Sequence, residues 1–427
     1  MIGEILVFLL TYFLIIARPW KFNEVTGSLT GAALMLLFLQ PHHVLEALGF
    51  ATQYKTPGVA TWNVVVILVE LMIISTFLED YGLFEWCATK AMSLGGGDGK
   101  KIFDCIYLIT CIISTFASNN IAILTMTPVI LMFCRRTGFD PKPFMYSSFF
   151  AANIASMFLL PGNLTNIMIG DGFHIGYLHF TAFMFLPTIA ALILNYAAFR
   201  FWYNGMIDKP YQIEKTDPVK LIKDKRMVYL GIIVLAFVLI AFGFANNMGI
   251  PPAIVTTLGI IPLYLAERRP LHRTVRVSWG VAIFVFSLFI VVKGLEVSGL
   301  NTLVSGLILS IVGQNPILTT YFISLSSALL CNVFNNIPMT AMMVPITTGI
   351  AGTRDMALAL AYSLVIGSNL GANITITGAL AGILWLETGK AEGWSTNIIE
   401  FVKTGLMVTP LAILSAASVL ALQIILV

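Results

Sequence analysis

Long apolar runs alternate with short polar segments along almost the whole chain. In the first half, these runs cover about residues 4–18, 25–40, 62–80, 144–175 and 178–202. In the second half, they cover about residues 227–245, 252–266, 278–293, 356–386 and 403–426. Apolar segments of this kind predict helices that cross a lipid bilayer. The pattern therefore predicts an all-α polytopic membrane protein with about five transmembrane spans in each half.

Two further apolar stretches, at about 102–133 and 317–350, are interrupted at their centres by polar side chains. The interruptions are Ser118-Asn119-Asn120 and Asn335-Asn336. The first stretch has basic residues at both ends, so both ends favour the same side of the membrane. Each stretch is therefore predicted to be a re-entrant hairpin, since non-helical backbone at this depth needs protein or a watery cavity around it.

Two of the predicted spans are broken in the middle. Residues 144–175 contain Pro161-Gly162, and residues 356–386 contain the run Gly367-Ser-Asn-Leu-Gly-Ala-Asn373. Proline removes a helical hydrogen-bond donor and glycine frees the backbone, so a break has a mechanical cause. We expect discontinuous helices at both places.

The two halves repeat one plan in the same order. Asn-Asn-Ile is followed by Asn-Leu-x-Asn-Ile in the first half and by Asn-Leu-x-x-Asn-Ile in the second. Each half has an odd number of spans, so the second half enters the membrane inverted. The sequence predicts two inverted repeats, residues 1–202 and 227–427, joined by a polar linker at 203–226. Inverted repeats with discontinuous helices are typical of secondary transporters.

Composition and charge place the chain in a membrane with a defined orientation. Hydrophobic residues make up 58% of the chain and charged residues only 11%, against about 25% charged in a soluble domain. In the predicted layout, 21 of the 24 Lys and Arg residues fall on one side. That side is cytoplasmic by the positive-inside rule. We therefore expect a cell inner membrane protein with both termini on the outer, periplasmic side and no nucleic-acid partner.

The polar breaks are candidates for a solute-binding site. An Asn side chain offers donors and an acceptor without net charge, and unwound backbone adds free N–H and C=O groups. The candidate residues are Ser118, Asn119, Asn120, Gly162, Asn163, Thr165, Asn166, Asn335, Asn336, Ser368, Asn369, Gly371, Asn373 and Thr375. We expect Asn120, Asn163, Asn336 and Asn369 to face the solute, and Asn166 and Asn373 to hold the backbone open. The alternative is that these amides only join helices to one another.

Two carboxylates and two thiols are further candidates. Glu70 lies near the middle of a span, where an ionisable residue is a functional hypothesis by default, and Asp104 lies near the entry of the first hairpin. Cys111 and Cys331 precede the two Asn pairs, and thiols are ligands for soft metal and metalloid ions, although buried Cys is common simply as a small apolar residue. The five cysteines have no metal-site or disulfide spacing, so we expect no cofactor and no zinc site.

Several motifs resemble those of the ArsB-type arsenite efflux permeases of the ion transporter superfamily. They are Leu83-Phe-Glu-Trp-Cys-Ala, the glycine-rich run at 95–99, Phe116-Ala-Ser-Asn-Asn, Asn335-Asn-Ile-Pro and Gly367-Ser-Asn-Leu-Gly-Ala-Asn-Ile-Thr. The resemblance implies proton-coupled export of arsenite or antimonite as neutral trihydroxides. Basic cytoplasmic loops would accommodate a soluble ATPase partner, although orientation alone explains them. Some family members carry an acidic residue at the position of Asn120 and Cys-Asp at Ser368-Asn369, and both motifs are neutral here.

A sodium/proton antiporter or an anion or dicarboxylate transporter of the same superfamily is the alternative. The antiporter would be expected to carry carboxylates in the Asn motifs, and the dicarboxylate carrier Ser-Asn-Thr triplets. Neither pattern occurs in these stretches. Hydrolase motifs such as HExxH and GxSxG are also missing from the sequence, so an enzyme is not expected.

Overall fold

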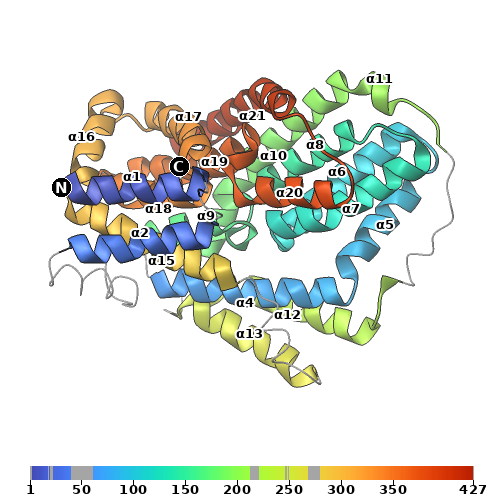
Figure 1. The fold of residues 1–427 in the computed structure, drawn as a ribbon, viewed down its shortest axis with the longest axis horizontal. Helices are drawn as coiled ribbons and strands as arrows, with labels where there is room; N and C mark the ends of the chain where they lie inside the picture. The colour runs from blue at the N-terminus through green and yellow to red at the C-terminus, as the bar shows by residue number, and fades with distance from the viewer. Residues whose placement is uncertain are drawn as a thin grey trace.

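The computed structural model describes residues 2–17, 19, 23–39, 61–211, 221–245, 248, 250–267 and 279–426. Residues 212–220 of the predicted linker and the basic segment 268–276 lie outside the described residues. Within the described part of the chain, every regular element is an α-helix or a 3-10 helix. Figure 1 shows the helices packed side by side, with the N-terminus at the left edge and α11 at the upper right.

The first half forms the helices α1 (Ile2–Ala17), α2 (Glu24–Phe38), α4 (Thr61–Asp80), α5 (Leu83–Leu94), α6 (Gly99–Phe116), α7 (Asn119–Thr137), α8 (Lys142–Ala155), η2 (Leu160–Gly162), α9 (Leu164–Gly172), α10 (Tyr177–Trp202) and α11 (Asn204–Ile207). The second half forms α12 (Lys225–Ala245), α13 (Pro252–Ala266), α15 (Trp279–Val297), α16 (Leu300–Val312), α17 (Pro316–Phe334), α18 (Asn336–Thr348), α19 (Arg354–Leu370), η4 (Gly371–Asn373), η5 (Ile376–Gly378), α20 (Leu380–Ala391) and α21 (Ile398–Leu426).

Six of the described helices are long and apolar enough to cross a membrane. They are found in α10, α12, α15, α17, α21 and the stretch Arg354–Asn373 that contains α19. Four shorter apolar helices, α1, α2, α13 and α16, accompany them. The prediction of an all-α polytopic membrane protein is therefore confirmed.

The stretch 102–133 folds as a helical hairpin whose tip is Ser118. α6 packs against α7, and the outer ends of both helices meet the segment that follows α11. At the α6 end, the backbone N–H of Gly99 donates to the carbonyl of Lys209 at 3.0 Å. At the α7 end, the ring of Phe133 lies edge-on to Tyr211 at 5.2 Å. Both ends of the hairpin thus lie at one end of the molecule, and the tip points into its middle.

The second hairpin consists of α17 and α18, which pack together and meet at Asn335. Each hairpin packs against a broken helix of the other half. α7 of the first half packs on α20 of the second, and α18 of the second half packs on α9 of the first. This crossed packing brings the two hairpin tips and the two helix breaks to the same level of the molecule.

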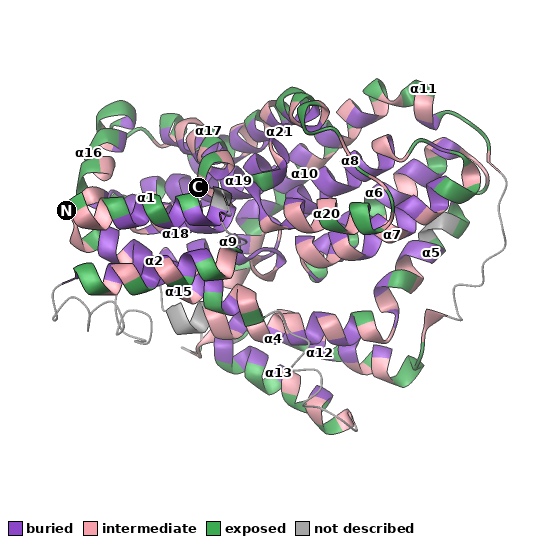
Figure 2. Ribbon diagram, viewed as in Figure 1, coloured by how far each residue is buried: buried purple, intermediate pink, exposed green. Residues whose placement is uncertain are grey.

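Burial separates a central bundle from helices that face outward. The stretch Arg354–Asn373 is 89% buried, whereas the apolar window of α12 is only 33% buried. Figure 2 shows the buried residues concentrated around α19 and α9, with α16 and the far end of α13 largely exposed or intermediate. Outward apolar residues such as Ile233, Phe237 and Ile240 on α12 are the surface expected to meet lipid.

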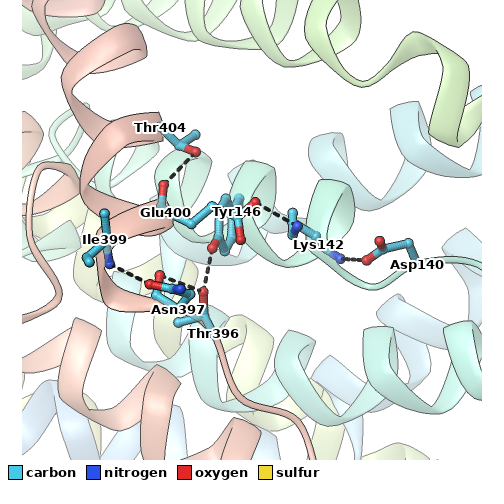
Figure 3. A network of polar contacts seen from close by, with 8 residues as sticks. All are labelled: Asp140, Lys142, Tyr146, Thr396, Asn397, Ile399, Glu400 and Thr404. Carbon is cyan, nitrogen blue, oxygen red and sulfur yellow. Dashed lines mark hydrogen bonds and ion pairs between the residues drawn. The ribbon is translucent and has the colours of Figure 1, made fainter.

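A polar network joins the broken helix of the first half to α21 and the turn before it, at the end where basic residues gather (Figure 3). Lys142, the first residue of α8, pairs with Glu400 of α21 at 2.6 Å, and the Tyr146 hydroxyl bonds to Thr396. Arg135 at the end of α7 pairs with Glu392 at 3.0 Å. The hydrogen bond to Glu400 is the main reason that the pKa of Lys142 is raised. We call this end of the molecule, with the 95–99 and 207–211 segments, the basic end.

Candidate functional site

A cavity of about 530 Å³ lies where the hairpin tips and helix breaks converge. The first tip contributes Ser118, Asn119 and Asn120, and the second tip contributes Asn336. The two breaks contribute Asn163 and Ala379. The remaining walls come mainly from α4 and from the first residues of α2 and α15. A cavity of this size, lined by apolar groups and a few convergent polar ones, has the form of a small-molecule site.

The two tips share an unusual backbone. Ser118 has φ 139° and Asn335 has φ 69°, and both are positive-φ residues other than glycine. Each residue caps the helix that follows: the Ser118 hydroxyl accepts from the Ile121 N–H and the Asn335 side-chain oxygen accepts from the Ile337 N–H, both at 3.4 Å. Strained backbone of this kind persists only where surrounding structure enforces it, and it concentrates at functional sites.

Besides α2 and α15, whose first residues line the cavity, four more helices begin at its wall. α7 starts at Asn119, α18 at Asn336, α9 directly after Asn163 and α20 directly after Ala379. A helix N-terminus carries unpaired N–H groups and a partial positive charge. The cavity is therefore suited to oxygen-rich solutes that accept hydrogen bonds.

One chain of amides links the first tip to the second break. The Asn119 side-chain N–H donates to Asn153 Oδ1, and the Asn153 N–H donates to Asn373 Oδ1, both at 2.9 Å. Asn153 and Asn373 are 0% and 1% exposed. Since each buried amide has a partner, the chain fixes Asn119 in the cavity wall.

A second network centres on Asn369, which is fully buried in the last turn of α19. Its oxygen accepts from the Asn163 N–H at 2.8 Å and from the Ser156 hydroxyl at 3.1 Å. Its N–H donates to Asn166 Oδ1 at 2.9 Å. Asn369 therefore holds the first break, and Asn163 with it, in position.

Asn336 differs from these amides. It is 3% exposed and lines the cavity. Its side-chain oxygen is buried and has no hydrogen-bond partner among the described residues. A buried acceptor without a partner is costly, so this oxygen is a place for a ligand donor.

The charged residues that line the cavity are carboxylates. Glu24, Glu79 and Asp80 line it. Glu79 and Asp80 precede Tyr81, whose carbonyl accepts from the Lys223 N–H. Among the described residues, no Lys, Arg or His lines this cavity. The described part of the lining therefore offers no cationic side chain to an anionic solute.

The structure brings only part of the predicted site to the cavity. Five predicted residues line it, namely Ser118, Asn119, Asn120, Asn163 and Asn336. Nine do not, namely Gly162, Thr165, Asn166, Asn335, Ser368, Asn369, Gly371, Asn373 and Thr375. The expectation that Asn369 faces the solute is not met, because its amide is consumed by Ser156, Asn163 and Asn166.

Several of these nine residues support the backbone of the breaks. A Cβ on Gly162 would lie 2.3 Å from the Ser156 carbonyl oxygen, and one on Gly371 would lie 2.5 Å from Ala328 Cα. The Asn166 N–H donates to the carbonyls of Ser156 and Leu159 at 2.8 and 2.9 Å. The backbone-holding role of Asn166 stays a prediction, and these two hydrogen bonds are the contacts it would use.

The sequence interpretation missed Asn153 and Asn332. Asn153 joins the two halves as described above. Asn332 donates to the carbonyl of Gly371 at 3.0 Å and accepts from the Thr375 hydroxyl at 2.7 Å. Both lie in apolar runs, as Ala-Asn-Ile and Cys-Asn-Val, without a Gly or Pro nearby to mark them. A lone Asn inside an apolar run was the available signal.

The echoed Asn motifs are not equivalent in space. Asn163 (φ −146°, ψ 145°) starts the second half of its broken helix, and the residue with the same backbone in the other break is Ala379 (φ −146°, ψ 158°). Asn369 instead ends the first half of its helix, as Asn153 nearly does in α8. At the tips, Ser118 matches Asn335 as helix cap, so Asn119, not Asn120, matches Asn336.

Glu70 lies outside the cavity, on the face of α4 that packs against α13. It is 7% exposed. Thr256 and Thr257 of α13 both bond to its carboxyl group, Thr257 at 2.6 Å. The same two hydroxyls also reach the carbonyl of Ala253 at 3.0 and 2.8 Å. A hydroxyl has one proton to donate. The two Thr hydroxyls can donate to a charged Glu70. When Glu70 is protonated and donates to one of them, that hydroxyl can donate to the Ala253 carbonyl instead.

The other titratable candidates also lie away from the cavity. Asp104 accepts from the Tyr196 hydroxyl at 2.8 Å and pairs with Arg200 at 3.6 Å, which joins α6 to α10. Cys111 packs among Tyr107, Ala151 and Ala155. Cys331 is fully buried, with its sulfur 3.7 Å from the Gly367 carbonyl oxygen. No group of three His, Cys, Asp or Glu side chains that could hold a metal occurs among the described residues.

Known proteins resemble this chain over most of its length. It is 27% identical to an arsenical pump membrane protein of Escherichia coli over 429 residues, 98% of each chain. It is 27% identical to the arsenical pump membrane protein of Yersinia enterocolitica over 372 residues, 85% of this chain and 87% of that one. A 46 kDa membrane protein of Mycobacterium leprae is 27% identical, with 98% of each chain covered.

A solved structure shares the fold. The YdaH transporter of Alcanivorax borkumensis, described as having an unusual topology, covers 98% of both chains with a TM-score of 0.62 and 12% identity. The family model described as citrate transporter, CitMHS, matches residues 12–367. These matches confirm the resemblance to arsenite permeases of the ion transporter superfamily and indicate a membrane transporter, not an enzyme. The chain therefore belongs to the CitMHS family of membrane transporters.

Proposed function

We propose that this transporter exports arsenite and antimonite, as neutral trihydroxides, from the cytoplasm in exchange for protons. The observation that carries the proposal is the lining of the 530 Å³ cavity, where neutral amides, hydroxyl groups and helix N-termini meet without a cationic side chain among the described residues. A trihydroxide both donates and accepts hydrogen bonds. Its hydroxyls would satisfy the unpartnered Asn336 oxygen, and its oxygens would accept from amide N–H groups.

The binding residues in this proposal are Ser118, Asn119, Asn120, Asn163 and Asn336, which line the cavity. Asn153, Asn166, Asn369 and Asn373 act as positioning residues, because they bond to the lining residues or to the backbone of the breaks. The cysteines have no part in binding here, since neither Cys111 nor Cys331 lines the cavity.

A second candidate is an organic anion, the substrate class in the family's description. The helix N-termini at the cavity favour it, because each supplies partial positive charge. Three carboxylates in the lining oppose it. We therefore rank the neutral solute first.

Glu70 is the proposed proton carrier. When ionised, it accepts from Thr256 and Thr257; when protonated, it donates to one of these hydroxyls, which in turn donates to the Ala253 carbonyl. Both charge states are satisfied, which a carrier that cycles between them requires. The orientation that goes with the exchange has the basic end in the cytoplasm.

Transport into everted membrane vesicles tests the proposal. With an imposed pH gradient, we expect accumulation of antimonite and arsenite but not of sodium or citrate. Glu70→Gln should abolish gradient-driven accumulation and leave solute–solute exchange intact, since exchange needs no net proton movement. Citrate accumulation without antimonite accumulation would overturn the first candidate in favour of the second. Loss of exchange in a well-folded Glu70→Gln protein would remove Glu70 from the proton role.

A further inference from the structure

A second cavity, of about 150 Å³, lies on the far side of the first helix break. The two cavities share two wall residues, Pro161 of η2 and Ile167 of α9. The start of α9 lines the large cavity at Leu164, and its end lines the small one at Asp171. The break and one short helix therefore separate the two cavities.

The small cavity lies away from the basic end. Along α4, residues from Leu68 to Asp80 line the large cavity, whereas Ile67 lines the small one. Ile67 and Glu79 are about 18 Å apart along the helix axis at 1.5 Å per residue. The small cavity also reaches Phe242, near the end of α12 remote from Lys225. The small cavity therefore lies towards the side of the membrane opposite the basic end.

Two helices, α4 and α13, place Glu70 and its Thr256 partner about one helical turn from this small cavity. On α4, Ile67 lines the cavity and Glu70 follows three residues later. On α13, Pro252 lines the cavity and Thr256, which bonds to Glu70, follows four residues later. Residues three and four apart share a helix face. Glu70 and Thr256 therefore lie directly behind the residues that form the wall of the small cavity.

The mouth of the small cavity carries titratable groups. Asp171 and His174 line it, together with Tyr177. His174 is exposed and has φ 53°, a left-handed conformation, and its N–H donates to the Asp171 carbonyl at 3.1 Å. α12 contributes Phe242 and α13 contributes Pro252 to the lining, neither of them charged. The nearby His179 on α10 and Arg354 on α19 do not line it.

We propose that the small cavity is a vestibule through which protons reach Glu70 from the face opposite the basic end, with Asp171 and His174 as relay groups at its mouth. The inference rests on the proton exchange of the proposed function. A volume of 150 Å³ holds several water molecules, which complete the path between the relay groups and the Glu70 wall. The solute and the proton then approach from opposite sides of the same helix break.

Carbodiimide labelling tests this route without any solute. A membrane-permeant carbodiimide converts a protonated carboxyl group to an N-acylurea, and mass spectrometry quantifies the product at Glu70, with Glu70→Gln as the blank. The pH outside right-side-out and everted vesicles is lowered while the inside is buffered. We expect Glu70 labelling to rise in right-side-out vesicles and to stay constant in everted ones. Labelling that follows the pH on the basic side, or neither pH, overturns the proposal.

The relay groups are tested in the same assay. At a fixed short labelling time, Asp171→Asn with His174→Gln should lower Glu70 labelling at each acidic pH by roughly tenfold, because the relay groups speed proton transfer. Asp355→Asn with His179→Gln is the matched control, since these residues lie near Arg354 at the same end without lining the vestibule. Equal pH profiles for the two double variants would remove the relay. If antimonite is not transported but labelling still follows the vestibule pH, the proposed function fails and the vestibule stands.

Discussion

At the scale of single residues, Asn336 differs from the other amides of the site in its hydrogen bonding. Its oxygen is buried at the cavity without a partner among the described residues, whereas Asn119, Asn163 and Asn369 have amide partners. An amide held in this state gains a hydrogen bond when a donor arrives. Asn336 is therefore the residue at which solute affinity should depend most on a single group.

Asn336→Ala should weaken antimonite binding by about 1–3 kcal/mol, roughly 5- to 150-fold, because a solute hydroxyl is left unpaired in a water-poor site. Isothermal titration or exchange assays on the purified protein measure the affinity. Asn301→Ala is the matched control: Asn301 of α16 is 8% exposed and also lacks partners for its side-chain atoms, but it does not line the cavity. Equal affinities for the two variants would show that the amide site is wrongly assigned.

Asn120→Asp tests the charge of the solute. The change keeps the shape of a half-buried cavity residue and adds a negative charge. Affinity for antimonite should fall because the new carboxylate no longer donates through an amide N–H. A gain in sodium affinity in this variant would instead favour the antiporter alternative.

Replacement of all five cysteines by Ser or Ala should leave most antimonite transport intact. Cys111, Cys134 and Cys331 are buried, and none of the five lines the cavity. Uptake into everted vesicles, normalised to the amount of folded protein, provides the measurement. If a well-folded Cys331→Ala protein transports no antimonite, sulfur takes part in transport after all.

At the scale of elements, Lys142 of α8 and Glu400 of α21 join the first broken helix to the last helix at the basic end (Figure 3). Their side chains are 30% and 43% exposed, so solvent screens the pair. We expect a coupling energy of about 0.2–1 kcal/mol, typical of exposed pairs. The pair therefore orients α8 against α21 more than it stabilises the fold.

A charge reversal measures this coupling. Lys142→Glu and Glu400→Lys should each lower the melting temperature in detergent, and the double reversal should recover part of the loss because opposite charges face each other again. Thermal unfolding of the wild type and the three variants completes the cycle. A double variant no more stable than the sum of the two single changes would show that the pair contributes nothing.

At the scale of the whole molecule, the crossed packing of α7 on α20 and α18 on α9 makes one cavity from both halves. Neither half contains a complete site, since Asn336 comes from one and Asn163 from the other. The repeat hypothesis adds that the second half is inverted, so that the two hairpins enter from opposite sides. This arrangement predicts which interhelical turns are accessible from the cytoplasm and which are accessible from the outer side.

Thiol labelling in the cysteine-free protein tests the topology. Lys390→Cys, beside the α20–α21 turn at the basic end, should react with an impermeant maleimide only in everted vesicles. Gln314→Cys, in the α16–α17 turn that leads into the second hairpin, should react only in intact cells. Both positions are exposed, so failure to react reflects the compartment. Labelling of both cysteines from the same side would refute the inverted arrangement.

The sequence by itself determined the membrane class, the order of the elements and the four polar stretches. Apolar runs have few alternatives in lipid, and Ser118-Asn119-Asn120 or Pro161-Gly162 inside such a run must interrupt it. These constraints are local, and the helices break close to where the sequence predicts, with α6 ending at Phe116 and η2 at Gly162.

Only the tertiary structure decided which amides face the cavity. Asn163 and Asn369 have the same local motif, but one starts a helix at the cavity and the other is consumed by three partners. It also assigned Asn153 to the network and Glu70 to a site with Thr256 and Thr257 outside the cavity. The reason is physical: a hydrogen bond between residues 186 to 220 positions apart depends on how the two halves pack, which no local pattern encodes.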